Sequence, residues 1–165
     1  GDLGQGVARL GQAFGMDVRI AARPGQPEGE VDGFPRQSLE RLLPVADVLS
    51  VHCLLSDDTR DLIDAQALRT MKESALLVNT SRGGIVNEQA LADALRQGDI
   101  AGAGVDVLTQ EPPVDGNPLL ADDIPNLLVT PHCAWASQEA RQRMVQQSAD
   151  NLQAFAAGTL ERWVV

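Results

Sequence analysis

Aromatic and basic residues are scarce in this chain of 165 residues. Aromatic residues make up 3% of it, tyrosine is absent, and 13 basic residues stand against 23 acidic ones, which gives a net charge of −10. Nucleic-acid binding depends on a basic face and often on aromatic platforms for stacking. The composition therefore disfavours a protein that binds DNA or RNA.

Long apolar runs and paired cysteines are missing as well. No apolar run approaches the roughly 18 residues that a membrane helix needs, and the first residues show no features of a secretory signal. The two cysteines, Cys53 and Cys133, lie far apart and form no C-x-x-C motif. We therefore expect reduced thiols in a cytoplasmic protein that has no contact with a membrane.

A regular alternation of short apolar runs with helix-like segments fills most of the chain. The hydrophobic content of 44% suits one globular domain over residues 1–165. Strands that alternate with helices predict an α/β fold with a doubly wound parallel sheet, covered by helices on both faces. Segment 24–35, rich in Gly, Pro and Glu, is predicted to be a loop. The predicted strands are 18–21, 47–51, 76–79, 101–107 and 126–130.

Two glycines open the chain ahead of a predicted helix. Gly1 and Gly4 match the last two glycines of the G-x-G-x-x-G turn that holds a pyrophosphate in dinucleotide-binding folds. Because the first glycine and its strand are missing, we expect a fragment truncated at the N-terminus that lacks the first, central strand. Such a glycine pair is also a common packing or capping feature, and that alternative stays open.

The position that meets the adenosine ribose lies about 20 residues past these glycines. An acid there would hold the 2′-hydroxyl of NAD, but the sequence has Ala22 followed by Arg23. Arg23 could neutralise the 2′-phosphate of NADP, or it could be an ordinary loop charge.

Three polar residues each follow a predicted strand within four positions: Arg82, Glu111 and His132. Parallel strands end at the same edge of a sheet, where open α/β folds bind their ligands. Singly, Arg82 fits a helix-start cap, Glu111 a loop acid and His132 a turn residue. Their recurrence at one edge favours a shared site. His52, which follows strand 47–51, is interpreted as a structural histidine.

Carbonyl reduction beside a carboxylate is the chemistry that would use such a trio. Arginine can bind the carboxylate of a 2-oxo acid through two parallel hydrogen bonds. Histidine titrates near neutrality and can donate the proton, and a glutamate bonded to the imidazole favours its charged form. A nicotinamide would supply the hydride. No metal-ligand cluster or nucleophile motif competes for this role.

The sequence resembles the D-isomer-specific 2-hydroxyacid dehydrogenase family. The resemblance rests on three segments: Asn79-Thr80-Ser81-Arg82-Gly83-Gly84-Ile85-Val86, Gly104-Val105-Asp106-Val107 leading to Glu111-Pro112, and Thr130-Pro131-His132. It covers essentially the whole chain as the NAD(P)-binding domain of that two-domain family, whose substrate domain would be absent here. It implies hydride transfer between NAD(P)H and a short 2-oxo acid to give a D-2-hydroxy acid, with the isolated fragment inactive.

The resemblance also implies a role for each matching residue. Arg82, Glu111 and His132 would be the catalytic residues. Asp106 would contact the nicotinamide amide, and Thr80 and Ser81 would lie near its ribose. The full set of implied cofactor contacts is Gly1, Asp2, Leu3, Gly4, Ala22, Arg23, Leu54, Thr80, Ser81, Arg82, Asp106 and His132.

Two positions depart from the family pattern. Ala22 stands where an acid is usual, which together with Arg23 slightly favours NADP over NAD, and Leu54 stands where proline is common. Segment 132–137 is most similar to the glycerate dehydrogenase and hydroxypyruvate reductase branch, so hydroxypyruvate or glyoxylate is the favoured substrate. The resemblance further implies a homodimer.

A second function of a different class stays open. The same fold could act as a dinucleotide-sensing module that controls a partner protein without turnover, or as an NAD-binding domain without activity. The presence of all three residues argues against the sensing module, because sensing does not require a glutamate beside a histidine, and the domain without activity stays open.

Overall fold

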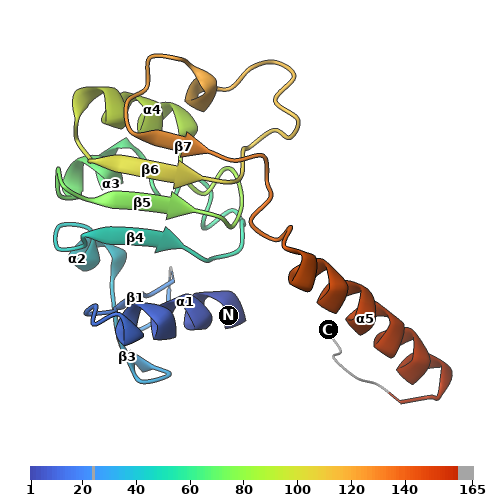
Figure 1. Cartoon of the computed structure of the whole chain (residues 1–165). Coiled ribbons are helices and arrows are strands. Elements are labelled where there is room, and N and C mark those ends of the chain that lie inside the picture. Colours follow the sequence, from blue (N-terminus) through green and yellow to red (C-terminus); the bar gives the residue numbers. More distant parts are fainter. Residues whose placement is uncertain (24, 160–165) are drawn as a thin grey trace. The chain divides into compact units, whose positions relative to one another are not determined.

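A parallel sheet forms the larger part of the fold. The computed structural model describes residues 1–23 and 25–159. In this part, β4 (Val48–Val51), β5 (Leu76–Asn79), β6 (Gly102–Val105) and β7 (Leu127–Val129) pair in that order, each pair parallel. Their arrowheads point the same way in Figure 1. Each strand lies inside a range predicted from the sequence, so the predicted parallel α/β sheet is confirmed.

Two helices connect these strands, and their ends follow from capping residues. Asp64 caps α3 (Ala65–Thr70) and Asn87 caps α4 (Glu88–Gln97), each side chain accepting a hydrogen bond from a backbone N–H three residues on. Gly98 ends α4 with a φ of 76°, in the left-handed region that glycine adopts without strain.

The core lies between the sheet and these two helices. Burial alternates along β5: Leu77 is fully buried, whereas Leu76 is 46% exposed. Leu77 joins Leu68 of α3 and Leu91 of α4 in one hydrophobic cluster. On the opposite face Leu128 is 66% exposed.

A second sheet precedes the parallel one. β1 (Ile20–Ala21) pairs in parallel with β3 (Phe34–Gln37), and β3 pairs antiparallel with β2 (Gly29–Val31). The loop predicted for 24–35 is therefore wrong at 29–31 and 34–35, which are in strands, and Pro24 lies outside the described residues. Asp32 and Gly33 have φ values of 52° and 82°, the signature of a two-residue hairpin turn between Val31 and Phe34. The Asp-Gly signal outweighs a composition that is typical of loops.

The two sheets are separate in the described residues. The strand orders β1-β3-β2 and β4-β5-β6-β7 leave β1 and β4 each with one hydrogen-bonded neighbour. A doubly wound fold has its central strand between these two. The described residues do not contain that strand, as the glycine pattern predicts.

Helix α1 (Asp2–Ala13) begins at Gly1, and Gly15 follows its end in the left-handed region. The predicted helix is confirmed, but its apolar stripe is not buried: Leu3 and Phe14 are both 83% exposed. Ala8, on the other side of the helix, is its buried residue. The shorter helix α2 (Leu39–Leu42) follows β3.

The chain divides into two compact units after Pro131. The second contains α5 (Gln138–Ala156), which Ser137 caps by accepting a hydrogen bond from Ala140 N. None of the helices in the described residues is long and apolar enough to cross a membrane.

Candidate functional site

A buried amide shapes the turn that carries Arg82. Asn79, the last residue of β5, is 2% exposed. Its Nδ2 donates to the carbonyl oxygen of Arg82 (3.0 Å), and its Oδ1 accepts from the backbone N (3.1 Å) and the Oγ (3.2 Å) of Ser81. Because all these partners lie within three residues, a single side chain determines the shape of the turn.

Arg82 extends from this turn into solvent. Its guanidinium donates from Nη1 to the carbonyl oxygen of Ser81 at 2.6 Å, and the residue is exposed, as is Thr80. The structure thus places Arg82 at the carboxyl end of β5, where the sequence predicts it.

The glycine after Arg82 allows a contact with the next loop. A Cβ on Gly83 would lie 2.1 Å from the carbonyl carbon and oxygen of Leu108 and 2.3 Å from Thr109 N. Backbone atoms cannot yield to such an overlap, so the Arg82 turn and the loop after β6 touch at a place that excludes any side chain. Gly84 has a φ of 81°, which also favours glycine.

Glu111 lies on that same loop. Its Oε1 accepts a hydrogen bond from Leu108 N at 2.8 Å, so the carboxylate folds back onto the peptide that Gly83 contacts. The structure therefore brings together the elements that carry Arg82 and Glu111. A shared edge for these two residues was predicted from the sequence.

Asp106 is a buried carboxylate, 3% exposed, at the end of β6. Thr130 Oγ1 donates to its Oδ1 at 2.5 Å, and its backbone N donates to the carbonyl oxygen of Asn79 at 2.9 Å. These bonds tie the ends of β5 and β6 and the residue after β7 together at the ligand-binding edge of the sheet.

His132 is the first residue of the second compact unit. It has a φ of 50°, and Trp135 Nε1 donates to its carbonyl oxygen at 2.9 Å. Its approach to Arg82 and Glu111 remains a sequence-based prediction.

A cavity of about 310 Å³ is lined by residues of both sheets and of α1. Four of the predicted cofactor contacts line it: Gly1, Gly4, Ala22 and Arg23. The other predicted contacts, including Asp2, Leu3 and Leu54, do not, and Leu54 is 82% exposed.

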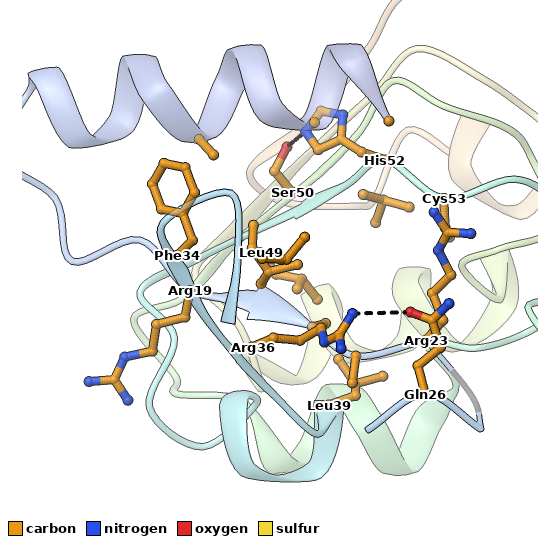
Figure 2. Close-up of a pocket in the computed structure, with 18 of the residues that line it drawn as sticks. Arg19, Arg23, Gln26, Phe34, Arg36, Leu39, Leu49, Ser50, His52 and Cys53 are labelled. Carbon is orange, nitrogen blue, oxygen red and sulfur yellow. Dashed lines mark hydrogen bonds between the residues drawn. The ribbon is translucent and has the colours of Figure 1, made fainter. Parts of the chain in front are cut away.

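Three arginines line this cavity: Arg19, Arg23 and Arg36 (Figure 2). The Arg23 guanidinium lies beside Cys53, and Arg36 extends toward Gln26, with Nη1 and Oε1 3.4 Å apart. Arg36 Nε is buried without a hydrogen-bond partner among the described residues. Arg19 extends away and donates to Asp17 from Nη2 at 2.8 Å.

His52 and Cys53, the two residues that follow β4, also line the cavity. His52 Nε2 lies 2.8 Å from Ser50 Oγ, and burial, with the charge of the amino terminus, lowers the pKa of the imidazole. A Cβ on Gly4 would lie 3.1 Å from His52 Cβ, so the start of α1 packs closely on this histidine. Burial raises the pKa of the Cys53 thiol, and the Arg23 charge partly opposes this shift. The bond to Ser50 and the packing on Gly4 agree with the structural interpretation of His52.

Sequence reasoning missed three residues that organise these sites: Asn79, Arg36 and Glu88. Asn79 at a strand end is a recognisable turn signal, because asparagine bonds readily to nearby backbone. Arg36 lies in β3, a strand that was not predicted from the sequence. Glu88 accepts bonds from residues 21 and 29 positions away, and no local pattern reveals such partners.

Comparison with known proteins assigns a family. Residues 1–134 match the family described as D-isomer specific 2-hydroxyacid dehydrogenase, NAD binding domain. Glycerate dehydrogenase of Methylorubrum extorquens is 49% identical over 158 residues, which are 96% of this chain and 48% of that protein. The chain thus spans about half the length of the curated relatives it matches.

Two solved structures are similar throughout the chain. The NADPH-dependent glyoxylate/hydroxypyruvate reductase of Sinorhizobium meliloti, in complex with NADP and malonate, is 35% identical with a TM-score of 0.80, covering 94% of this chain and 47% of that one. The D-isomer specific 2-hydroxyacid dehydrogenase of Lactobacillus delbrueckii ssp. bulgaricus, complexed with NAD, is 31% identical with a TM-score of 0.83, covering 100% and 53%. This chain belongs to the D-isomer specific 2-hydroxyacid dehydrogenase family and carries its NAD binding domain.

Proposed function

We propose that this chain is the cofactor-binding half of an NAD(P)-dependent D-2-hydroxyacid dehydrogenase. The whole protein would interconvert a short 2-oxo acid, of the hydroxypyruvate or glyoxylate type, and the corresponding D-2-hydroxy acid. Similar proteins named glycerate dehydrogenase, glyoxylate reductase and hydroxypyruvate reductase support this substrate class. A homodimer in the cytoplasm remains part of the proposal.

The observation that carries the proposal is the junction between the Arg82 turn and the Glu111 loop. Gly83 meets the Leu108–Thr109 peptide, and Glu111 accepts from Leu108 N. A guanidinium and a carboxylate are thereby held on adjoining elements at the ligand-binding edge of a parallel sheet. In the proposed site, Arg82 binds the substrate carboxylate, His132 donates the proton, and Glu111 holds the imidazole in its charged form.

The residues around the cavity fit an anionic dinucleotide. Gly1 and Gly4 begin a helix, whose free N–H groups suit a pyrophosphate. Arg23 and Arg36, which line the cavity, carry guanidinium donors for a further phosphate, and position 22 has alanine in place of an acid that would repel it. These residues favour NADPH. When bound, the nicotinamide supplies or accepts the hydride.

The test is turnover by the whole protein with glyoxylate, hydroxypyruvate and pyruvate, each assayed with NADH and NADPH. His132→Ala should lower kcat by about 10²-fold or more, with a smaller effect on the KM of the 2-oxo acid. Arg82→Ala should raise that KM and lower kcat together. Arg69→Ala removes an exposed arginine near the end of α3, and we expect it to change neither.

Two outcomes would overturn the assignment in different ways. Cofactor binding without turnover of any 2-oxo acid would favour the dinucleotide-sensing module. Turnover that survives His132→Ala unchanged would leave the dehydrogenase in place but refute the role of His132.

A further inference from the structure

The loop after β6 is held by α4 through one carboxylate. Glu88, the first residue of α4, accepts from Thr109 N at Oε1 (2.6 Å) and from Asn117 Nδ2 at Oε2 (2.7 Å). Both oxygens of this half-buried side chain therefore bond to the loop, one near Glu111 and one at the far end. Glu88 thereby joins the two ends of segment 109–117.

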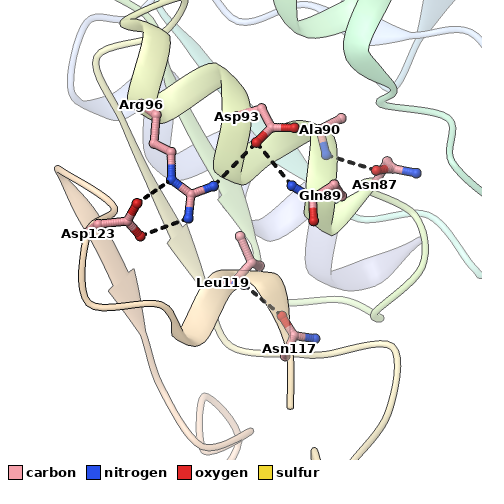
Figure 3. Close-up of polar contacts among 8 residues, drawn as sticks. All are labelled: Asn87, Gln89, Ala90, Asp93, Arg96, Asn117, Leu119 and Asp123. Atoms are coloured by element: carbon pink, nitrogen blue, oxygen red, sulfur yellow. Dashed lines mark hydrogen bonds and ion pairs between the residues drawn. The ribbon is translucent and has the colours of Figure 1, made fainter. Parts of the chain in front are cut away.

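An acid in the first turn of a helix has an ordinary explanation, which is its interaction with the helix dipole. Here the capping role belongs to Asn87, whose Oδ1 accepts from Ala90 N at 2.9 Å (Figure 3). The Glu88 carboxylate accepts its hydrogen bonds from another element, the loop after β6. Charge-assisted bonds of this kind are about twice as strong as neutral ones, so Glu88 is suited to hold the loop.

The Leu108–Thr109 peptide is the point at which the site elements converge. Its atoms contact Gly83 of the Arg82 turn, Leu108 N donates to Glu111, and Thr109 N donates to Glu88. A shift of this peptide would move the Glu111 carboxylate relative to the Arg82 turn.

A second attachment of α4 provides a natural comparison. Arg96 donates to Asp123 from Nε and Nη2, both at 2.8 Å, and Nη1 lies 3.3 Å from Asp93 Oδ1 (Figure 3). This ion pair holds a later segment, at Asp123 ahead of β7. Both carboxylate partners of Arg96, Asp93 and Asp123, lie outside residues 108–111.

We propose that Glu88 is a positioning residue, which holds the Leu108–Thr109 peptide and thereby places the Glu111 carboxylate beside the Arg82 turn. The inference rests on the proposed function. Glu88 itself touches neither substrate nor cofactor; it acts through Glu111.

The test is a double-mutant cycle in the whole protein, with kcat expressed per cofactor-binding site so that unfolded protein does not count. Glu88→Ala should lower kcat roughly tenfold to a hundredfold, the cost of misplacing a catalytic group, while the Kd for NADPH stays within about twofold. In a Glu111→Gln background, Glu88→Ala should cause no further loss, because a residue that acts through Glu111 has nothing left to position. Arg96→Ala should leave kcat unchanged.

Independent, multiplying losses in the two variants would overturn the proposal, and so would an unchanged kcat in Glu88→Ala. Should Glu88→Ala fold poorly, Glu88→Gln replaces the carboxylate by a neutral amide with one acceptor oxygen in place of two, which weakens the attachment of Thr109 N, and we expect an intermediate kcat. An unchanged kcat in Glu88→Gln would then contradict the positioning role.

Hydrogen exchange on this chain separates failure of this inference from failure of the proposed function. The Thr109 amide should exchange faster in Glu88→Ala than in the unaltered chain or in Arg96→Ala, whether or not the whole protein turns over any 2-oxo acid. Equal exchange in all three chains would refute the attachment itself.

Discussion

At the scale of single residues, cofactor choice depends on guanidinium groups at the cavity. Arg23 and Arg36 line it, and Arg36 Nη1 donates a long hydrogen bond to Gln26 Oε1, at 3.4 Å. Arg19 lines the same cavity but donates to Asp17 at 2.8 Å. The arginines at the cavity therefore differ in how strongly neighbouring side chains hold them, and so in how readily they can bind a phosphate.

We expect Arg23→Ala and Arg36→Ala to raise the Kd for NADPH more than the Kd for NADH. A hydrogen bond to a charged group contributes about 1.5–3 kcal/mol, which corresponds to about tenfold or more in Kd. Fluorescence titration of this chain with both nucleotides measures the difference. Arg19→Ala is the matched control and should leave the ratio of the two Kd values unchanged. Equal effects on both nucleotides would make Arg23 an ordinary loop charge.

The sequence predicted the placement of Arg82 and Glu111 because both follow parallel strands, whose ends lie at one edge by necessity. It could not predict what holds them there. Asn79 and Glu88 act through hydrogen bonds that depend on the turn and on the long loop being folded. The close contact of Gly83 with Leu108 likewise depends on two segments that are far apart in the sequence.

At the scale of elements, the β2–β3 hairpin is joined to α2 by the carboxylate of Glu28. Ser38 N donates to Oε1 and Arg41 Nη1 to Oε2, both at 2.9 Å. Ser38 stands at the N-cap position of α2, but its side chain makes no capping bond. Instead, its backbone N–H bonds to Glu28 and links the hairpin to the helix start.

Acid should weaken this connection. The bond from Ser38 N, with Arg41, lowers the pKa of Glu28 below its ordinary value of 4.5. A carboxyl whose pKa is lower in the folded chain stabilises it above the ordinary value and loses that effect as the pH falls through the folded value. Glu28→Gln should therefore lower the urea midpoint at pH 7, and the difference from the unaltered chain should shrink below pH 4.5. Glu73→Gln, at another exposed acid, should show no such trend. A difference that persists at low pH would mean that charge is not the cause.

Elements with strong local signals were predicted well. The strand β5 and the helix α4, with its Asn87 cap and terminal Gly98, lie where the sequence places them. The hairpin was missed because its strands are short and include Gly29, Glu30 and Pro35, residue types that are depleted in sheets, while its turn signal is two residues long. The helix α1 was predicted from its apolar spacing, but spacing alone does not reveal whether another surface covers the stripe.

At the scale of the whole molecule, a chain of about half the relatives' length would provide, under the proposed function, the cofactor site and one side of the reaction site. Arg82 is exposed at the sheet edge, and hydride transfer to a small oxo acid requires a site from which water is excluded. Dehydrogenation in the proposed two-domain protein would depend on closure of a second domain over this edge.

This chain by itself should therefore bind NADPH and yet not reduce glyoxylate or hydroxypyruvate. Binding is expected because Gly1, Gly4, Ala22 and Arg23 all lie at one cavity of the first unit. Turnover is not expected, because the substrate would meet Arg82 in open solvent. There a carboxylate gains little when it exchanges water for a protein partner. Nucleotide titration followed by absorbance of the reduced nicotinamide measures both properties in one sample, and the His132→Ala chain gives the background rate. A Kd for NADPH close to that of the whole protein would show that the cofactor site is intact. Reduction at a rate like that of the whole protein would then contradict the need for a second domain, and would place every group required for the reaction within these residues.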